Sequence, residues 1–312
     1  SVAEGEEAVP QTLLHLIGDK GQSADGGGVV SYKWTVKQPG GSNQVFLPGP
    51  AYANPTFRAN VAGEYVFCLD VVDASGQKAC APACKTVLVL PEEAIHVELV
   101  WSTPGDLVET DTGPAAGTDL DLHFAHRLSK AKDLDCDGTP DPWFTTPFDT
   151  FWFTPNPNWG SATNAGDDPS LDRDDTDGAG PENLNLDEPE GTVAKPTYYD
   201  VGVHYWNAKG FGKSFATVNV YVLGVLAVQI ANVEMNELDM WHVGRLNWPN
   251  TMSSPGVTVD PFQICYASGS PCDKKAPGKF WQPKGAWCIT PCYVSPIGGM
   301  GSGLGGGGCA AP

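Results

Sequence analysis

The sequence predicts an all-β protein made of tandem β-sandwiches, with a loop-rich insert in the second sandwich and a disulfide-rich C-terminal extension. Composition is the first reason, because 37 Gly and 27 Pro stand against only 4 Met among 312 residues, which favours strands and turns over helices. Second, short segments of alternating apolar and polar residues recur between Gly- and Pro-containing turns. Third, the chain is longer than the ~100–200 residues of one domain.

The charge balance limits the partners that the chain can have. Lys and Arg number 18 against 37 Asp and Glu, which gives a formal net charge of −19. Binding to nucleic acid requires basic residues that neutralise phosphates, so no nucleic-acid partner is expected. No transmembrane segment is expected either, because the longest apolar stretch, residues 218–231, is interrupted by Asn219 and Gln229.

Nine cysteines, together with the excess of acidic residues, indicate an oxidising compartment and disulfide bonds. The chain begins at Ser1 without Met, which fits a mature chain after removal of a signal peptide, or a fragment. We therefore expect a secreted, extracellular or cell-surface protein. The odd count leaves at least one thiol free or bonded to another chain, for which Cys309 is the best candidate. The disulfide candidates are Cys68, Cys80, Cys84, Cys265, Cys272, Cys288 and Cys292.

The first sandwich is expected over residues 13–91, after an acidic N-terminal segment at residues 1–12. Residues 30–36 and 63–71 alternate apolar and polar side chains, as strands with one buried face do, and residues 86–90 complete the set. Gly-rich and Asp-containing turns separate these strands, which predicts a small antiparallel sandwich.

These elements resemble a PKD domain, an Ig-like β-sandwich found on extracellular proteins. The resemblance covers residues 13–90 and implies a spacer or binding module without catalytic residues. With a hairpin tip at Ser75, antiparallel pairing places Cys68 opposite about residue 82, so a bridge to Cys80 or to Cys84 is expected. The motifs that carry the resemblance are Tyr32-x-Trp34, Pro39-Gly-Gly-Ser42, Gly63-x-Tyr65-x-Phe67-x-Leu69-x-Val71-x-Asp73-x-x-Gly76 and Val87-x-Val89.

A second sandwich is expected over residues 94–250, with an acidic, loop-rich insert at residues 127–196. Its expected strands are residues 95–101, 119–124, 199–206, 214–223, 225–233 and 239–248. Residues 251–312 form a Cys-, Pro- and Gly-rich extension. Two intrachain bonds among its first four cysteines are favoured over a zinc site, because of the oxidising compartment.

Three motifs of the second sandwich resemble an uncharacterised domain of secreted bacterial proteins that has an Asp-Leu-Asp-Leu-His strand. The resemblance implies a β-sandwich and an extracellular compartment, and it brings no established activity. The motifs are the opening Val97-x-Leu99-x-Trp101, then Asp119-Leu-Asp121-Leu-His123, and Gly202-Val-His204-Tyr-Trp206.

The insert carries the strongest chemical signal. Between residues 133 and 190, fifteen acidic residues accompany a single basic residue, Arg173. Carboxylates at this density repel one another, so a folded insert calls for cations, and Ca²⁺ suits such oxygen ligands best. Residues 133–141 match the first half of an EF-hand-type loop, although its twelfth position is Phe144 instead of Glu. The expected ligands are Asp133, Asp135, Asp137, Asp141, Asp172, Asp174, Asp177, Glu182, Asp119 and Asp121. The alternative is a solvated acidic loop.

A catalytic transition metal is a weaker alternative. Asp119, Asp121 and His123 share one face of a strand, and imidazole with carboxylate suits zinc. A metal-dependent hydrolase would need His123, His204 or His242 to meet at one point. The chain has no His-Glu-x-x-His motif and no nucleophile elbow in a strand–turn–helix context, so we expect no enzyme.

An aromatic run beside the acids has three interpretations. Trp143, Trp152 and Trp159 are candidates for a platform that stacks on sugars. Anchoring of the insert on the sandwich core is the favoured interpretation, and contact with another protein is the third.

The leading hypothesis is a secreted or cell-surface structural protein, stabilised by calcium and self-assembling into an extracellular fibre, appendage or layer. This would make it a homopolymer or homo-oligomer. A carbohydrate- or matrix-binding adhesin is the second hypothesis.

Overall fold

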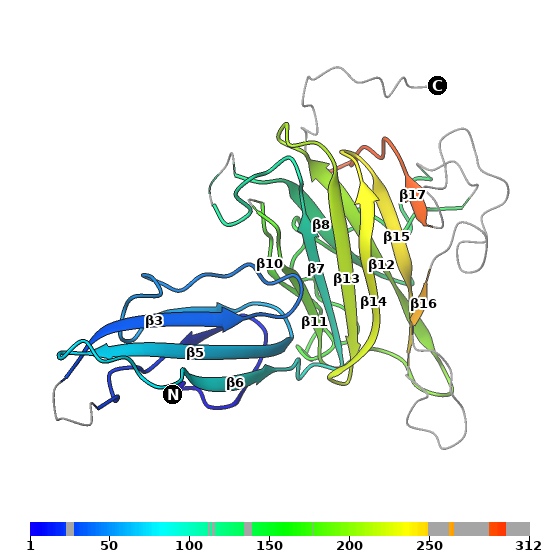
Figure 1. Cartoon of the computed structure of the whole chain (residues 1–312). Coiled ribbons are helices and arrows are strands. Elements are labelled where there is room, and N and C mark those ends of the chain that lie inside the picture. Colours follow the sequence, from blue (N-terminus) through cyan, green and yellow to red (C-terminus); the bar gives the residue numbers. More distant parts are fainter. Residues whose placement is uncertain are drawn as a thin grey trace. The chain divides into compact units, whose positions relative to one another are not determined.

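The computed structural model describes residues 1–22, 28–111, 113, 116–133, 139–176, 178–248, 262–264 and 287–297 (Figure 1). Within these ranges the regular secondary structure is entirely β, so the predicted fold class is confirmed. The chain divides into two compact units, Ser1–Glu92 and Glu93–Pro312. Among the described residues, no helix has the length and apolar character needed to cross a membrane.

The first unit is a small sandwich of two sheets. Its four-stranded sheet has the order β1-β6-β5-β3, with β1 parallel to β6 and the other pairs antiparallel, and β2 pairs with β4. The strands are β1 (Glu7–Ala8), β2 (Thr12–His15), β3 (Val29–Lys37), β4 (Thr56–Ala59), β5 (Gly63–Asp73) and β6 (Ala83–Val89).

The alternation predicted for the first unit forms its core. Tyr65, Phe67 and Leu69 of β5 are buried on one face, and Phe57 of β4 packs edge-on against Phe67. Trp34 of β3 is buried as well, and its indole N–H donates to the carbonyl of Tyr52 at 3.1 Å. The sequence pattern therefore identified the inward face of both long strands, except at Val30, which is 64% exposed beside a register shift between Val29 and Ser31.

A disulfide joins β5 and β6 on the face of the sheet opposite this core. Cys68 lies directly opposite Cys84 in the β5–β6 ladder, and the two are bonded. Cys80 is free and exposed. The sequence left Cys80 and Cys84 both open as the partner of Cys68. Strand β6 begins only at Ala83, so residues 80–82 lie outside the ladder, and Cys84 is the residue opposite Cys68.

Removing this disulfide is expected to destabilise the first unit. The bond closes a loop with a sequence separation of 16. A loop of this length corresponds to about 3 kcal/mol of lost chain entropy in the unfolded state. Denaturant unfolding of the Cys68→Ala/Cys84→Ala variant should show a loss of this order, whereas Cys80→Ala should match the wild type. Equal losses in both variants would contradict the assignment.

The second unit is a larger sandwich. One sheet has the order β10-β11-β7-β13-β14, and the other has the order β16-β15-β12-β8-β9, with β17 also paired to β15. The strands are β7 (Ile95–Ser102), β8 (Asp119–His126), β9 (Asp149–Thr150), β10 (Ser170–Arg173), β11 (Glu182–Leu186), β12 (Thr197–Asn207), β13 (Ser214–Val222), β14 (Val225–Met235), β15 (Met240–Trp248), β16 (Phe262–Ile264) and β17 (Cys288–Thr290).

The core of this unit lies between its two sheets. Val97 and Leu99 of β7 meet Leu120, Leu122 and Phe124 of β8 in one buried cluster. Because side chains alternate along β8, Asp119, Asp121 and His123 necessarily point to the other face of that strand. The predicted faces of β8 are thus the observed ones.

The insert is more ordered than the sequence predicted. Three strands, β9, β10 and β11, come from it. Strand β11 pairs with β7 along its whole length, and Leu184 and Leu186 enter the core. The description of residues 127–196 as loop-rich is therefore too simple. Residues 182–186 do alternate polar and apolar side chains, but Asn is uncommon in strands, and this short strand was missed. Strands β16 and β17 likewise attach described parts of the C-terminal extension to β15.

Candidate functional site

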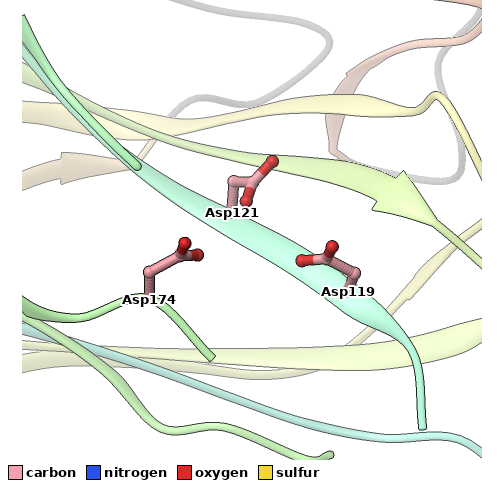
Figure 2. Close-up of side chains that lie close together, drawn as sticks. All are labelled: Asp119, Asp121 and Asp174. Carbon is pink, nitrogen blue, oxygen red and sulfur yellow. The ribbon is translucent and has the colours of Figure 1, made fainter. Parts of the chain in front are cut away.

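Three aspartates of the second unit converge on one point. Asp119 and Asp121 lie on β8, and Asp174 follows β10. One carboxylate oxygen from each lies within 4.8 Å of the others (Figure 2). Asp121 is only 2% exposed and Asp119 only 8%, whereas Asp174 reaches the surface. Two acids held out of water are thus placed beside a third.

Close backbone packing brings Asp174 to β8. Residues Thr118 and Gly178 form an isolated β-bridge. Gly117 has a φ of +54°, and a Cβ at this position would stand 2.7 Å from the backbone of Gly178. Only glycine allows this approach without strain. Because β10 and β8 belong to different sheets, the three aspartates link the two layers of the sandwich.

Glu182 supports the cluster from the buried side. It is the first residue of β11 and is 1% exposed. Its Oε2 accepts a hydrogen bond from the backbone N–H of Leu122 at 2.6 Å, and its Oε1 accepts one from Asp175 at 3.2 Å. The side chain thereby fixes both β8 and the segment that carries Asp174.

The electrostatics of the cluster favour a positive ligand. Burial, followed by repulsion from Asp121 and Asp174, raises the pKa of Asp119 to about 8. Burial also raises the pKa of Asp121 to about 8, and it raises the pKa of Glu182 well above its usual range. Lys209 partly offsets the effect on the pKa of Asp119. Without a cation, these three acids therefore stay protonated at pH values at which ordinary Asp and Glu side chains are ionised.

A buried histidine faces the same cluster. His204 on β12 lies opposite Asp121 and is fully buried. Its Nε2–H donates to the carbonyl of Tyr293 at 2.8 Å, so Nδ1 carries a lone pair. Burial lowers the pKa of His204 to about 4, which keeps the ring neutral. Nδ1 lies 3.9 Å from Oδ2 of Asp121, and neither atom has a hydrogen-bond partner among the described residues. When Asp121 is ionised, these atoms are two facing acceptors, and they leave room for a cation or a hydrogen-bond donor.

A pocket opens on the carboxylates. It has a volume of about 120 Å³, and two indoles, those of Trp152 and Trp206, form part of its wall. The two rings meet edge to face with centroids 5.5 Å apart. The full lining is Asp119, Asp121, Trp152, Asp174, Thr176 and Trp206.

The other predicted ligands lie elsewhere or outside the described ranges. Asp172 is exposed and accepts hydrogen bonds from Asn185 and Ser170, so it points away from the cluster. Asp141 is buried and accepts a hydrogen bond from the Tyr293 hydroxyl at 2.9 Å. Asp133 is described but does not join the three aspartates. The remaining predicted ligands, Asp135, Asp137 and Asp177, lie outside the described residues, so the EF-hand-type loop stays a prediction.

The predicted aromatic platform is wrong for two of its three members. Trp143 is 3% exposed and Trp159 is 2% exposed, because both anchor the insert on the sandwich. Trp159 stacks on Tyr199, and Trp143 packs edge-on against His242. Only Trp152 of the three lines the pocket, together with Trp206. Trp206 was missed as a site residue, although the alternation of β12 places it on the same face as His204.

The histidines do not assemble a metal centre among the described residues. His123 bonds to Asp149 at 2.7 Å, with both side chains fully buried. His242 pairs with Asp200, which Arg245 also holds through two hydrogen bonds. The group within ligand distance in the described ranges contains only aspartates, so the geometry expected of a hydrolase is not found there.

The C-terminal cysteines fit the disulfide prediction where they can be seen. Cys288 and Cys292 are each disulfide-bonded, which rules them out as thiolate zinc ligands. Cys265, Cys272 and Cys309 lie outside the described residues.

Comparison with known proteins identifies the first unit. Residues 8–87 match the family "K319L-like, PKD domain". The solution structure of the PKD domain from KIAA 1837 protein is similar at 22% identity, covering 28% of this chain and 83% of that one, with a TM-score of 0.23. The D00-D0 domain of intimin aligns at 10% identity over 76% of this chain and 98% of that one, with a TM-score of 0.19. No curated protein matches the chain significantly. The N-terminal unit is therefore a PKD domain with an Ig-like fold.

Proposed function

We propose that the chain is a non-catalytic extracellular protein whose second sandwich is stabilised by a calcium ion held by Asp119, Asp121 and Asp174. The observation that carries this proposal is the convergence of three carboxylates within 4.8 Å, two of them buried. PKD domains are typically extracellular and non-catalytic, which supports the compartment and the absence of a reaction.

Calcium is the cation that the ligand set suits best. The three side chains offer only oxygen atoms, which favours a hard cation over zinc or copper. Magnesium demands near-ideal octahedral geometry and releases its water reluctantly, whereas calcium accepts six to eight oxygens in flexible arrangements. Calcium therefore suits better a site whose carboxylates come from two separate segments, because its coordination geometry is flexible.

The proposed role of the ion is structural. Asp121 and Asp174 are far apart in sequence and come from different sheets. A site built from such distant positions exists only in the folded state, so binding of the ion favours the folded sandwich over the unfolded chain. The ion would also remove the repulsion among buried carboxylates, so its binding energy becomes stability of the second sandwich.

Calcium binding to the full-length chain, measured by calorimetric titration, tests the proposal. Asp121→Asn should weaken the affinity on the order of tenfold or more, because it removes one of three charged ligands. Asp172→Asn is the matched control, since Asp172 belongs to the same acidic segment but points away. Equal affinities in the two variants, or no binding by the wild type, would overturn the proposal.

Self-assembly is proposed on separate grounds. Strand β14 ends the strand order of its sheet, and Val225 and Leu226 on it are 60% and 46% exposed. A long apolar edge strand favours pairing with another chain. Light scattering should find species larger than the 33.0 kDa of one chain, and a Leu226→Lys variant should be monomeric. A wild-type monomer at all concentrations would contradict this part.

A further inference from the structure

The pocket beside the three aspartates has more ligand positions than the described side chains fill. Asp119, Asp121 and Asp174 present one oxygen each within mutual ligand distance. Calcium takes six to eight oxygens. Both oxygens of Glu182 already accept backbone N–H groups, so this side chain is engaged with the fold. The remaining positions on the ion face the pocket, where solvent or a ligand would supply oxygen atoms.

The charge of the site selects the class of ligand. Three aspartates around a divalent cation leave a net charge of −1, and the chain as a whole carries −19. A carboxylate or phosphate ligand would be repelled by both. Neutral oxygen donors are therefore favoured for the open positions, and adjacent hydroxyl groups on one molecule can occupy two of them.

The indoles supply a second mode of contact. Trp152 and Trp206 line the pocket and are only half-buried, unlike Trp143 and Trp159. An indole offers a large, rigid apolar surface at little conformational cost, and it suits the C–H face of a sugar ring. The pocket volume of about 120 Å³ accommodates several waters, and hence the hydroxyl-bearing edge of one ring.

A buried polar atom beside the aspartates is a second indication of a ligand. His204 is fully buried, and its unpartnered Nδ1 faces Oδ2 of Asp121 at 3.9 Å. A cation on the Asp121 carboxylate would offset the repulsion between its negative charge and the facing lone pair of Nδ1.

We propose that this pocket binds the terminal residue of a neutral glycan, with two sugar hydroxyls on the calcium ion and the ring against Trp206 and Trp152. The inference rests on the proposed calcium site and adds to it a ligand class. The same calcium ion would then both stabilise the sandwich and bind the glycan.

Binding of the full chain to an array of neutral oligosaccharides, in calcium and in EGTA, tests the inference. The expected result is calcium-dependent binding to a subset of neutral glycans. Trp206→Ala and Trp152→Ala should each reduce that binding on the order of tenfold, because each removes an indole from the pocket wall. Trp206→Phe should retain part of it. Tyr52→Ala is the control, because Tyr52 is an aromatic residue of the first unit that is 56% exposed and does not line the pocket.

The outcomes separate this inference from the calcium site itself. Each tryptophan variant is first titrated with calcium, which it should still bind. Where a variant fails to fold, terbium bound to the wild type replaces it: a neutral sugar should displace water from the ion and lengthen its emission lifetime. Calcium binding without any calcium-dependent glycan binding would overturn the inference and leave the proposed function intact. Binding confined to anionic glycans or to amines would also overturn it.

Discussion

Calcium will raise the melting temperature of the second sandwich, and a chelator will lower it. A ligand that binds only the folded state at about 100 times its Kd stabilises that state by about 2.7 kcal/mol. For a unit of about this size, the gain corresponds to roughly 5–11 °C. Scanning calorimetry of the full chain should show this shift in the transition of the second unit, and none in the transition of the PKD domain.

The variants make this prediction specific to the three aspartates. Asp121→Asn should remove most of the calcium-induced shift, whereas Asp172→Asn should keep it, because the Asp172 carboxylate is turned toward Asn185. A shift of the same size in all three proteins would place the stabilising ion at another site. A calcium-indifferent wild type would contradict the structural role altogether.

The metal-stripped protein will lose stability as the pH rises from about 6.5 to 8. In the folded state the pKa values of Asp119 and Asp121 are raised to about 8, while unfolded aspartates titrate near ~4. Between these values the folded state binds more protons than the unfolded state, so stability falls with rising pH. Each extra proton contributes about 1.4 kcal/mol per pH unit. This trend is opposite to that of an ordinary ion-paired aspartate.

The choice of pH window and of variant isolates the effect. The pKa values of His126 and His204 are lowered to about 4 in the folded state. These two residues make stability rise with pH, but only below ~6.5, the pKa of an unfolded histidine, and thus below the chosen window. His96, whose pKa is raised, adds to the expected loss. Urea unfolding of the wild type and of Asp121→Asn across the window should therefore give a smaller slope in the variant. Saturating calcium should flatten the dependence of wild-type stability on pH. Identical slopes of stability against pH in the wild type and in Asp121→Asn would mean that the cluster does not titrate as described.

The sequence predicted the faces of β8 because strict alternation leaves only one solution. Once Leu120 and Leu122 enter the core, Asp119 and Asp121 must face the other side. The acidic excess also predicted part of the aspartate cluster, since Asp174 belongs to the predicted second group. Asp172 was indistinguishable from Asp174 in sequence. Its exclusion depends on the pairing of β10 with β11, which sets Asp172 beside Asn185.

Burial of the tryptophans could not be derived from the sequence. For an aromatic run within an acidic loop, the sequence favoured anchoring over exposure but could not assign either to a particular tryptophan. The packing of Trp159 against Phe124 and Tyr199, on strands distant in sequence, decides in favour of anchoring. Trp206 was overlooked for a related reason, because its partner Trp152 comes from the insert. Such pairings arise only when the tertiary structure is known.

A crystal structure of the full chain grown with calcium tests the central claim most directly. The account predicts an ion about 2.3–2.6 Å from carboxylate oxygens of Asp119, Asp121 and Asp174. It also predicts further oxygen ligands on the side that faces Trp152 and Trp206. A calcium ion bound only at other residues, with the three aspartates hydrogen-bonded to water or to one another, would contradict the account.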